Sequence, residues 1–137
     1  MNLATVSGRL TGQRLIGVER SDYDWLFRFT NDASLRVPGP WRILMEGRIA
    51  LGDCDHGQKF GLPEPVDGPA EAKRLLSNKS IQAVVVREDA GDLAITFSDR
   101  TVLEVFQISS GHEGWQIGIP GLNVVVMGGG DLAMWKS

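Results

Sequence analysis

Hydrophobic and polar residues alternate along most of the chain with the period of two that is typical of β-strands. The alternation is clearest at residues 25–29, 41–45, 93–97 and 115–119, where every second residue is large and apolar. The 17 glycines and 6 prolines separate these short segments, together with polar turn residues. The pattern therefore predicts about ten short strands, joined mostly as antiparallel neighbours.

One pattern of residues occurs twice. Residues 24–37 align with residues 92–105 without a gap, at a shift of 68 positions (92 − 24). Residues 41–47 then align with residues 115–121 at a shift of 74 (115 − 41), and each of these segments begins with tryptophan and ends with glycine. Because the two tryptophans occupy equivalent positions, we expect both Trp41 and Trp115 in the core.

The repeat predicts the organisation of the chain. We expect one domain over residues 1–137, composed of two related antiparallel β-halves, residues 13–52 and 81–127. Either a barrel or a pair of packed sheets would bury the alternating faces. The fold class expected is α+β and mostly β, with one short helix between the halves.

The segment between the halves departs from the strand pattern. Residues 52–67 are rich in Gly, Pro and Asp, and they are too many for a simple hairpin connection, so we expect either a functional loop or a surface cover. Residues 68–78 follow with the signature of a helix: Pro69 fits its first turn, and apolar residues at positions 72, 75 and 76 share one face.

Composition and charge restrict the function. The hydrophobic content of 42% and charged content of 23% are ordinary for a globular protein. The formal net charge of −3 argues against a nucleic-acid-binding protein and gives no attraction to an anionic membrane. No apolar run reaches the roughly 18 residues of a membrane span, and the N-terminus lacks the pattern of a secretory signal, so we expect a cytoplasmic protein. Cys54 is the one cysteine, which excludes an intrachain disulfide.

Two loops contain the residues with the most chemical potential. A thiol, an imidazole and two carboxylates occur together, and a second loop could complete their site; the residues are Asp53, Cys54, Asp55, His56, His112 and Glu113. Known zinc patterns use paired Cys or His at set spacings, which are absent here, so an ordinary polar loop is the competing interpretation and no metal or cofactor is predicted. Cys54 with His112 could form a nucleophilic pair, whereas an inert cysteine is the more common outcome.

Three further features have structural interpretations. Asp24 and Asp92 occupy equivalent turn positions, where carboxylates usually bond to nearby backbone groups. The run Gly128–Gly130 resembles a phosphate-binding loop only superficially, because too few residues follow it to form the required helix. Trp135, in the C-terminal tail, is predicted to contact another chain or to clasp its own domain, which leaves a homodimer open.

Several segments resemble small bacterial proteins without an assigned function, some of which are similar to toxin-immunity proteins. The resemblance is carried by Trp41-Arg42-Ile43, Asp92-Leu93, Phe97-Ser98-Asp99, Leu103-Glu104-Val105-Phe106, the run from Ser109 to Trp115 (Ser-Ser-Gly-x-Glu-x-Trp), and Gly129-Gly130. It implies a protein that binds and silences a toxin inside the cell that produces it. It implies no catalytic residues.

The sequence favours a binding protein over an enzyme. We expect a protein-binding module, an immunity-like inhibitor in its narrower form, whose binding residues include Asp53, Cys54, Asp55, His56, His112, Glu113 and Trp135. The alternative is a small-molecule or metal-dependent enzyme that uses the 52–67 loop with His56, His112 and Glu113.

Overall fold

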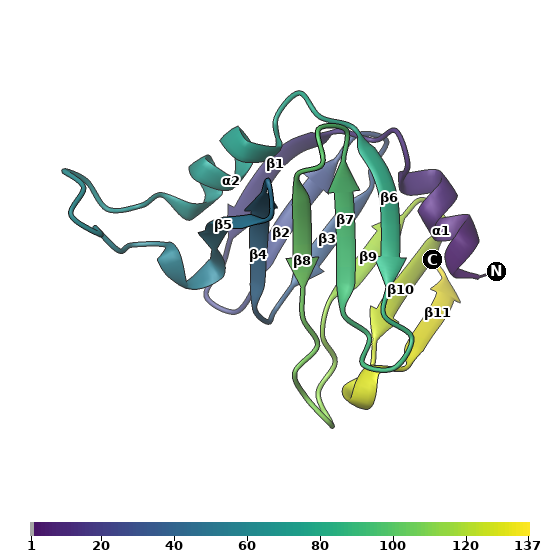
Figure 1. Ribbon diagram of the computed structural model, residues 1–137. Coiled ribbons are helices and arrows are strands. Elements are labelled where there is room, and N and C mark those ends of the chain that lie inside the picture. The colour runs from purple at the N-terminus through teal and green to yellow at the C-terminus, as the bar shows by residue number, and fades with distance from the viewer. Residues whose placement is uncertain (1) are drawn as a thin grey trace.

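Two antiparallel sheets pack face to face in the computed structural model, which describes residues 2–137 (Figure 1). The strands are β1 (Leu15–Arg20), β2 (Trp25–Phe29), β3 (Ser34–Val37), β4 (Trp41–Met45), β5 (Arg48–Gly52), β6 (Ile81–Val86), β7 (Leu93–Phe97), β8 (Val102–Val105), β9 (Gln116–Ile119), β10 (Leu122–Val126) and β11 (Leu132–Lys136). The α-helices are α1 (Leu3–Leu10) and α2 (Gly68–Leu76), and the short 3-10 helices are η1 (Asp53–Asp55) and η2 (Gly128–Gly130). The prediction of a mostly β, α+β fold is confirmed, in the form of packed sheets.

Each sheet contains strands from both halves of the chain. The six-stranded sheet has the order β1-β2-β3-β9-β10-β11, and the five-stranded sheet has the order β5-β4-β8-β7-β6. The first three strands of each half, β1–β3 and β6–β8, therefore lie side by side in one sheet. The next two strands of each half belong to the sheet of the other half, because β9 pairs with β3 and β4 pairs with β8. Both halves run in the same order, one α-helix, five strands and a 3-10 helix, and β11 follows the second. An origin by duplication stays a prediction.

The core lies between the sheets and contains the inward face of nearly every strand. Trp41 and Trp115 are 2% and 1% exposed, as the repeat predicted. Trp25, for which the repeat gave no expectation, is also buried, and its ring lies edge-on to that of Trp41 at a centroid distance of 4.8 Å. The apolar alternation seen in the sequence is therefore the inner face of the sandwich.

The predicted helix between the halves is confirmed as α2, and a second helix that the sequence did not predict, α1, precedes the first strand. α2 packs against β1 and β5 at one end of the sandwich, and α1 packs against β6 at the other, so each helix covers an open end between the sheets (Figure 1). Two further contacts hold α1 and the segment after it: Arg9 donates to the Pro120 carbonyl at 2.8 Å, and the Gly12 amide donates to the Ile81 carbonyl at 2.7 Å. No helix among residues 2–137 is both long enough and apolar enough to cross a membrane.

The C-terminal tail forms a strand that the sequence pattern did not predict. Residues 132–136 form β11, which pairs with β10 along its whole length and gives the six-stranded sheet its last strand. Leu132 and Met134 pack against the core from this strand. The described part of the chain therefore has eleven strands rather than about ten.

A charged contact ties the end of α2 to the turn between β7 and β8. Lys79 Nζ lies 2.8 Å from Asp99 Oδ2 and also donates to the Leu75 carbonyl and the Thr101 hydroxyl. The hydrogen bond from Lys79, together with hydrogen bonds from Thr101, lowers the pKa of Asp99 to about 2.

This low pKa predicts a contribution to acid stability. A carboxyl group whose pKa is lower in the folded state stabilises the fold fully above its unfolded pKa of about 3.9, and this stabilisation is lost as the pH falls to about 2. Because the Asp99 side chain is 45% exposed, we expect less than about 1 kcal/mol. Urea unfolding of Asp99→Asn between about pH 2 and 5 should show a flatter pH dependence than the wild type, with a small loss of stability at neutral pH. Parallel curves for the two proteins would contradict this assignment.

Candidate functional site

Four of the predicted site residues follow β5 directly. Asp53, Cys54 and Asp55 form η1, and the Asp55 carboxylate accepts a hydrogen bond from the Gly52 amide at 2.8 Å. Partial burial raises the pKa of Asp53 above its usual value, although hydrogen bonds from backbone amides oppose this effect. The Cys54 side chain is exposed, with its sulfur 3.9 Å from Asp55 Oδ1. The Asp55 carboxylate therefore stabilises the end of β5.

His56 connects this turn to α2. Its Nδ1 accepts a hydrogen bond from the Gly68 amide at 2.9 Å, and its ring lies edge-on to Trp25 at 6.1 Å. The contact needs glycine at position 68, because a Cβ there would lie 2.6 Å from Trp25 Cη2 and 3.1 Å from His56 Cβ. His56 thus fixes where α2 begins relative to β2.

Between His56 and α2 the chain forms a projecting hairpin, residues 57–66, which we call the arm (Figure 1). Its base is closed by hydrogen bonds from the Gly57 amide to the Val66 carbonyl and from the Val66 amide to the Gln58 carbonyl, both 2.8 Å. Phe60 and Gly61 occupy its tip with φ values of 47° and 79°, the left-handed pair of a tight hairpin turn. The arm is therefore a folded element with its own hydrogen bonds.

The tip of the arm exposes large apolar side chains. Phe60 is 68% exposed and Leu62 is 54% exposed, and Ile49 on neighbouring β5 is 61% exposed. A left-handed backbone conformation is unfavourable for a phenylalanine. A ring that stays exposed also contributes little hydrophobic free energy to the stability of its own fold. Phe60 is therefore poorly explained by the stability of this chain alone.

A groove of about 550 Å³ lies between the arm, β5 and α2. Its lining is mainly apolar with several acidic groups; the residues are Ala50, Leu51, Asp55, Phe60, Leu62, Glu64, Pro65, Val66, Asp67, Ala70, Glu71 and Arg74. A hydrogen bond from Arg74 holds the pKa of Glu71 below its usual value, and Asp67 caps α2 through the Ala70 amide. The groove thus combines an apolar floor with a net negative rim.

His112 and Glu113 lie on a different loop, between β8 and β9. Both are exposed, and the His112 backbone is held by the Ser109 hydroxyl and the Gln107 side-chain amide. This loop leaves the bottom of the sandwich in Figure 1, whereas the arm leaves it at the left. In the described part of the chain, no group of three or more His, Cys, Asp and Glu side chains is placed to hold a metal ion. The structure therefore offers no support for a site shared by the two histidines.

Trp135, the remaining predicted binding residue, lies on β11 and is 42% exposed. It is paired in register with Asn123 of β10. Figure 1 shows β11 at the right of the sandwich, on the side away from α2 and the arm. Trp135 therefore belongs to a surface of its own, separate from the groove.

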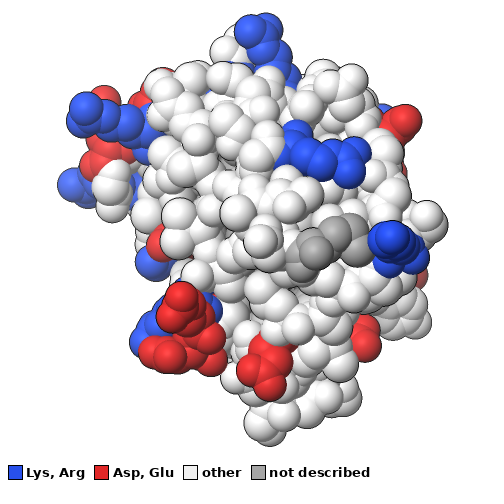
Figure 2. Space-filling view, turned by 90° about the vertical axis from the view of Figure 1, so that its right-hand side faces the viewer, with Lys and Arg blue, Asp and Glu red and all other residues white. Residues whose placement is uncertain are grey.

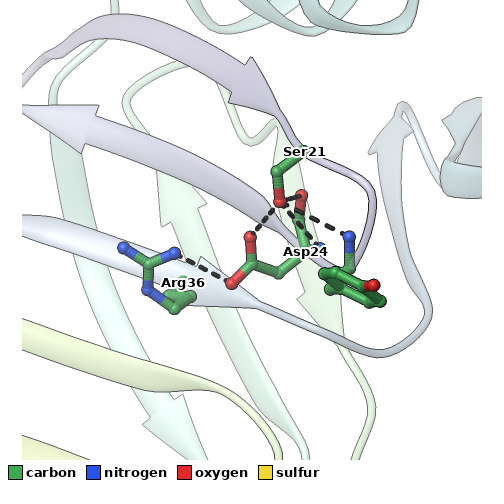
Figure 3. Close-up of polar contacts among 4 residues, drawn as sticks. Ser21, Asp24 and Arg36 are labelled. Atoms are coloured by element: carbon green, nitrogen blue, oxygen red, sulfur yellow. Dashed lines mark hydrogen bonds and ion pairs between the residues drawn. The ribbon is translucent and has the colours of Figure 1, made fainter.

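Asp24 lies in the turn between β1 and β2, but its carboxylate bonds to side chains instead of the nearby backbone groups that were predicted. Its Oδ1 accepts from the Ser21 hydroxyl at 2.7 Å, and its Oδ2 lies 2.8 Å from Arg36 Nη1 on β3 (Figure 3). The bond from Arg36, followed by that from Ser21, lowers the pKa of Asp24. Asp92, its equivalent in the repeat, accepts a hydrogen bond from the Gln107 amide. Both carboxylates thus hold the ends of hairpins together.

The predicted site residues and the groove share one segment of the chain, but the prediction did not include the apolar residues of the groove. It selected the polar and metal-binding types at positions 53–56, whereas the groove is built largely by Phe60, Leu62 and Val66. A usable signal was present, because glycines and prolines surround these large apolar residues in a segment with no strand or helix pattern.

Comparison with known proteins identifies a family without a described activity. A family model described as a family of unknown function, DUF6188, matches residues 26–136. No curated protein and no solved structure matches the chain. The match includes most of β2, the arm, α2 and all of β11.

Proposed function

Since the chain belongs to DUF6188, a family of unknown function, we propose from the geometry that it is a protein-binding module whose docking surface is the groove with the tip of the arm. The observation that carries the proposal is the exposure of Phe60 and Leu62 on a hydrogen-bonded arm beside an apolar groove. Large apolar side chains on a preorganised element are typical anchors of protein interfaces, because they lose little conformational freedom on binding.

The rim of the groove indicates the chemistry of the partner. Four of its lining residues are acidic, Asp55, Glu64, Asp67 and Glu71, against the single cation of Arg74. A partner with basic residues around an apolar patch would match this surface, and the charges would mainly accelerate association. An immunity-like inhibitor that covers the basic active site of a toxin is the narrower form of the proposal.

The proposal can be tested with matched variants. Phe60→Asp and Leu62→Asp place a charge on the arm, while Ile108→Asp places one at a comparably exposed apolar residue, 75% exposed, on the β8–β9 loop. Immobilised wild type and all three variants would be incubated with extract of the native host, and the bound proteins would be quantified by mass spectrometry. We expect one partner retained by the wild type and Ile108→Asp, and reduced about 30-fold or more by each arm variant, the effect of removing a hot-spot residue.

One result of this experiment would contradict the proposed docking surface. Identical proteins recovered from the wild type and both arm variants, with thermal unfolding of the variants unchanged, would exclude the groove as the docking surface. The toxin form has an additional test: the identified partner should inhibit growth when it is expressed alone, and co-expression of the wild type should restore growth, whereas Leu62→Asp should not.

A further inference from the structure

Four strands lie at the edges of the two sheets: β1, β5, β6 and β11. Three of them carry a one-residue irregularity in their pairing, with Ile16 of β1, Ala50 of β5 and Gln82 of β6 as the extra residues. Such bulges disrupt the free edge and prevent another chain from pairing with it. β11 has none, because all five of its residues pair with β10 in continuous register. It is thus the one regular edge among the four.

The unpaired backbone groups of β11 can be assigned from its two ends. The Met127 amide donates to the Asp131 carbonyl at 2.7 Å, and the Ser137 amide donates to the Gly121 carbonyl at 3.2 Å. Hydrogen-bonded pairs alternate along an antiparallel ladder, so residues 133 and 135 also direct their backbone groups toward β10. The N–H and C=O groups of residues 132, 134 and 136 therefore point away from the sheet.

These free groups are symmetric about Met134. We propose that β11 pairs antiparallel with β11 of a second copy of this chain, with the two-fold axis at Met134, to form one continuous sheet across a dimer. Met134 would then pair with Met134 of the other copy and Leu132 with Lys136, and each of these pairs exchanges two backbone hydrogen bonds. A two-fold interface requires such a self-complementary arrangement.

The side chains on the outer face fit the same register. Ala133 faces Trp135 of the second copy, and the indole, 42% exposed in the single chain, would lie across the small methyl group. Figure 2 shows the side of the molecule at the right of Figure 1, where white areas separate scattered charged groups. β11 itself carries one charged side chain, that of Lys136, so few charges of this strand would be desolvated when the second copy binds.

The dimer goes beyond the proposed function because it uses the opposite end of the sandwich. β11 lies at the right of Figure 1, and α2 and the arm lie at the left. Both grooves of the dimer stay open, so it would bind its partner bivalently, and avidity would strengthen binding to a multimeric or surface-bound partner.

A charge exchange tests the interface and its register together. Ala133→Glu or Trp135→Lys alone would disrupt the contact between the indole and the methyl group and place a charge against an uncharged neighbour, so each should weaken the dimer about tenfold or more. When both substitutions are combined, the new carboxylate of one copy would face the new ammonium group of the other. The dissociation constant of this double variant should therefore return to within about threefold of the wild-type value. Val85→Glu, on the bulged edge strand β6, is the control that should leave the dimer unchanged.

Sedimentation velocity on the full chain gives the readout. At a protein concentration of about 100 μM, the wild type should show a mass twice the 15.0 kDa of one chain. This concentration is suited to a weak dimer, whose dissociation constant is in the micromolar range. Met134→Pro removes an N–H that makes no bond within the chain, so it should give a monomer with little loss of secondary structure by circular dichroism. Amide exchange followed by NMR should show the Met134 N–H protected in the wild-type dimer and exchanging faster in the monomeric Ala133→Glu variant.

Two results would overturn the proposal. One is a wild type that stays at 15.0 kDa at this concentration. The other is a dimer that tolerates both single charge variants or is not restored by the double variant. The arm variants Phe60→Asp and Leu62→Asp should leave the dimer intact, which separates this outcome from that of the docking experiment.

Discussion

Replacing Gly130 by alanine is expected to lower the free energy of unfolding by about 4 kcal/mol, from backbone strain and overpacking together. Gly130 is buried at the end of η2 with a φ of 113°, which an L-residue rarely adopts. A Cβ at this position would lie 2.6 Å from the carbonyl carbon of Ala90 and 2.7 Å from the carbonyl oxygens of Ala90 and Asp89. These are backbone atoms, so the turn between β6 and β7 would have to move.

Gly129→Ala is the matched control. Gly129 also has a positive φ, 88°, but a Cβ there would meet nothing within 4 Å. Only the backbone strain remains, which should cost about 1–2 kcal/mol. Urea unfolding of the two variants, followed by tryptophan fluorescence, measures the difference. Equal losses would show that Gly130 is needed for its backbone conformation alone.

Close backbone contacts explain a glycine run whose role the sequence could not show. Gly128–Gly130 resembled a phosphate-binding loop only superficially, and in the structure it lets η2 pack directly on other backbone segments. A Cβ on Gly128 would lie 2.5 Å from Gly111 Cα, and one on Gly91 would lie 2.7 Å from the Gly130 carbonyl oxygen. The segments that require these glycines are distant in sequence, so no local pattern identifies the requirement.

Secondary structure was predictable wherever an apolar face was regular. The central strands alternate strongly, and α2 carries both a capping residue and a proline in its first turn, so its start at residue 68 was predicted correctly. α1 was missed because only Val6 and Leu10 are buried and Gly8 interrupts the pattern. β11 was missed because its inner residues are only partly buried at the edge of a sheet. An element with few buried residues therefore shows little apolar periodicity in its sequence.

The sequence predicted which segment would be irregular, but not that apolar side chains of this segment would line a groove. The long Gly-, Pro- and Asp-rich segment was recognised as a functional loop or a cover, and it forms one wall of the groove. Its histidine and carboxylates left two interpretations open, an ordinary polar loop and a metal or catalytic site, and in the structure His56 and Asp55 bond to nearby backbone amides. Residue types indicate what a side chain could do, while its hydrogen-bond partners depend on how loops distant in sequence come together.

The largest contrast between the two halves is expected at their equivalent tryptophans. Trp115 Nε1 donates to the Gly91 carbonyl at 2.8 Å in a buried environment. Trp115→Phe removes this donor and leaves a buried carbonyl without that bond, so we expect a loss of about 2–3 kcal/mol, including the smaller ring. Equilibrium unfolding in urea at neutral pH measures it.

Trp41→Phe should cost much less, although the same atoms are removed. Trp41 Nε1 is buried and has no hydrogen-bond partner in residues 2–137, so phenylalanine removes an unsatisfied donor whose burial is itself unfavourable. The ring keeps its edge-on packing position between Trp25 and Phe27, with centroid distances of 4.8 and 5.3 Å. The loss of ring volume is nearly the same in both variants, so their difference, about 2 kcal/mol, combines the lost Trp115–Gly91 hydrogen bond with the removal of the unsatisfied Trp41 donor. A larger loss for Trp41→Phe than for Trp115→Phe would mean that a bound water satisfies the Trp41 indole.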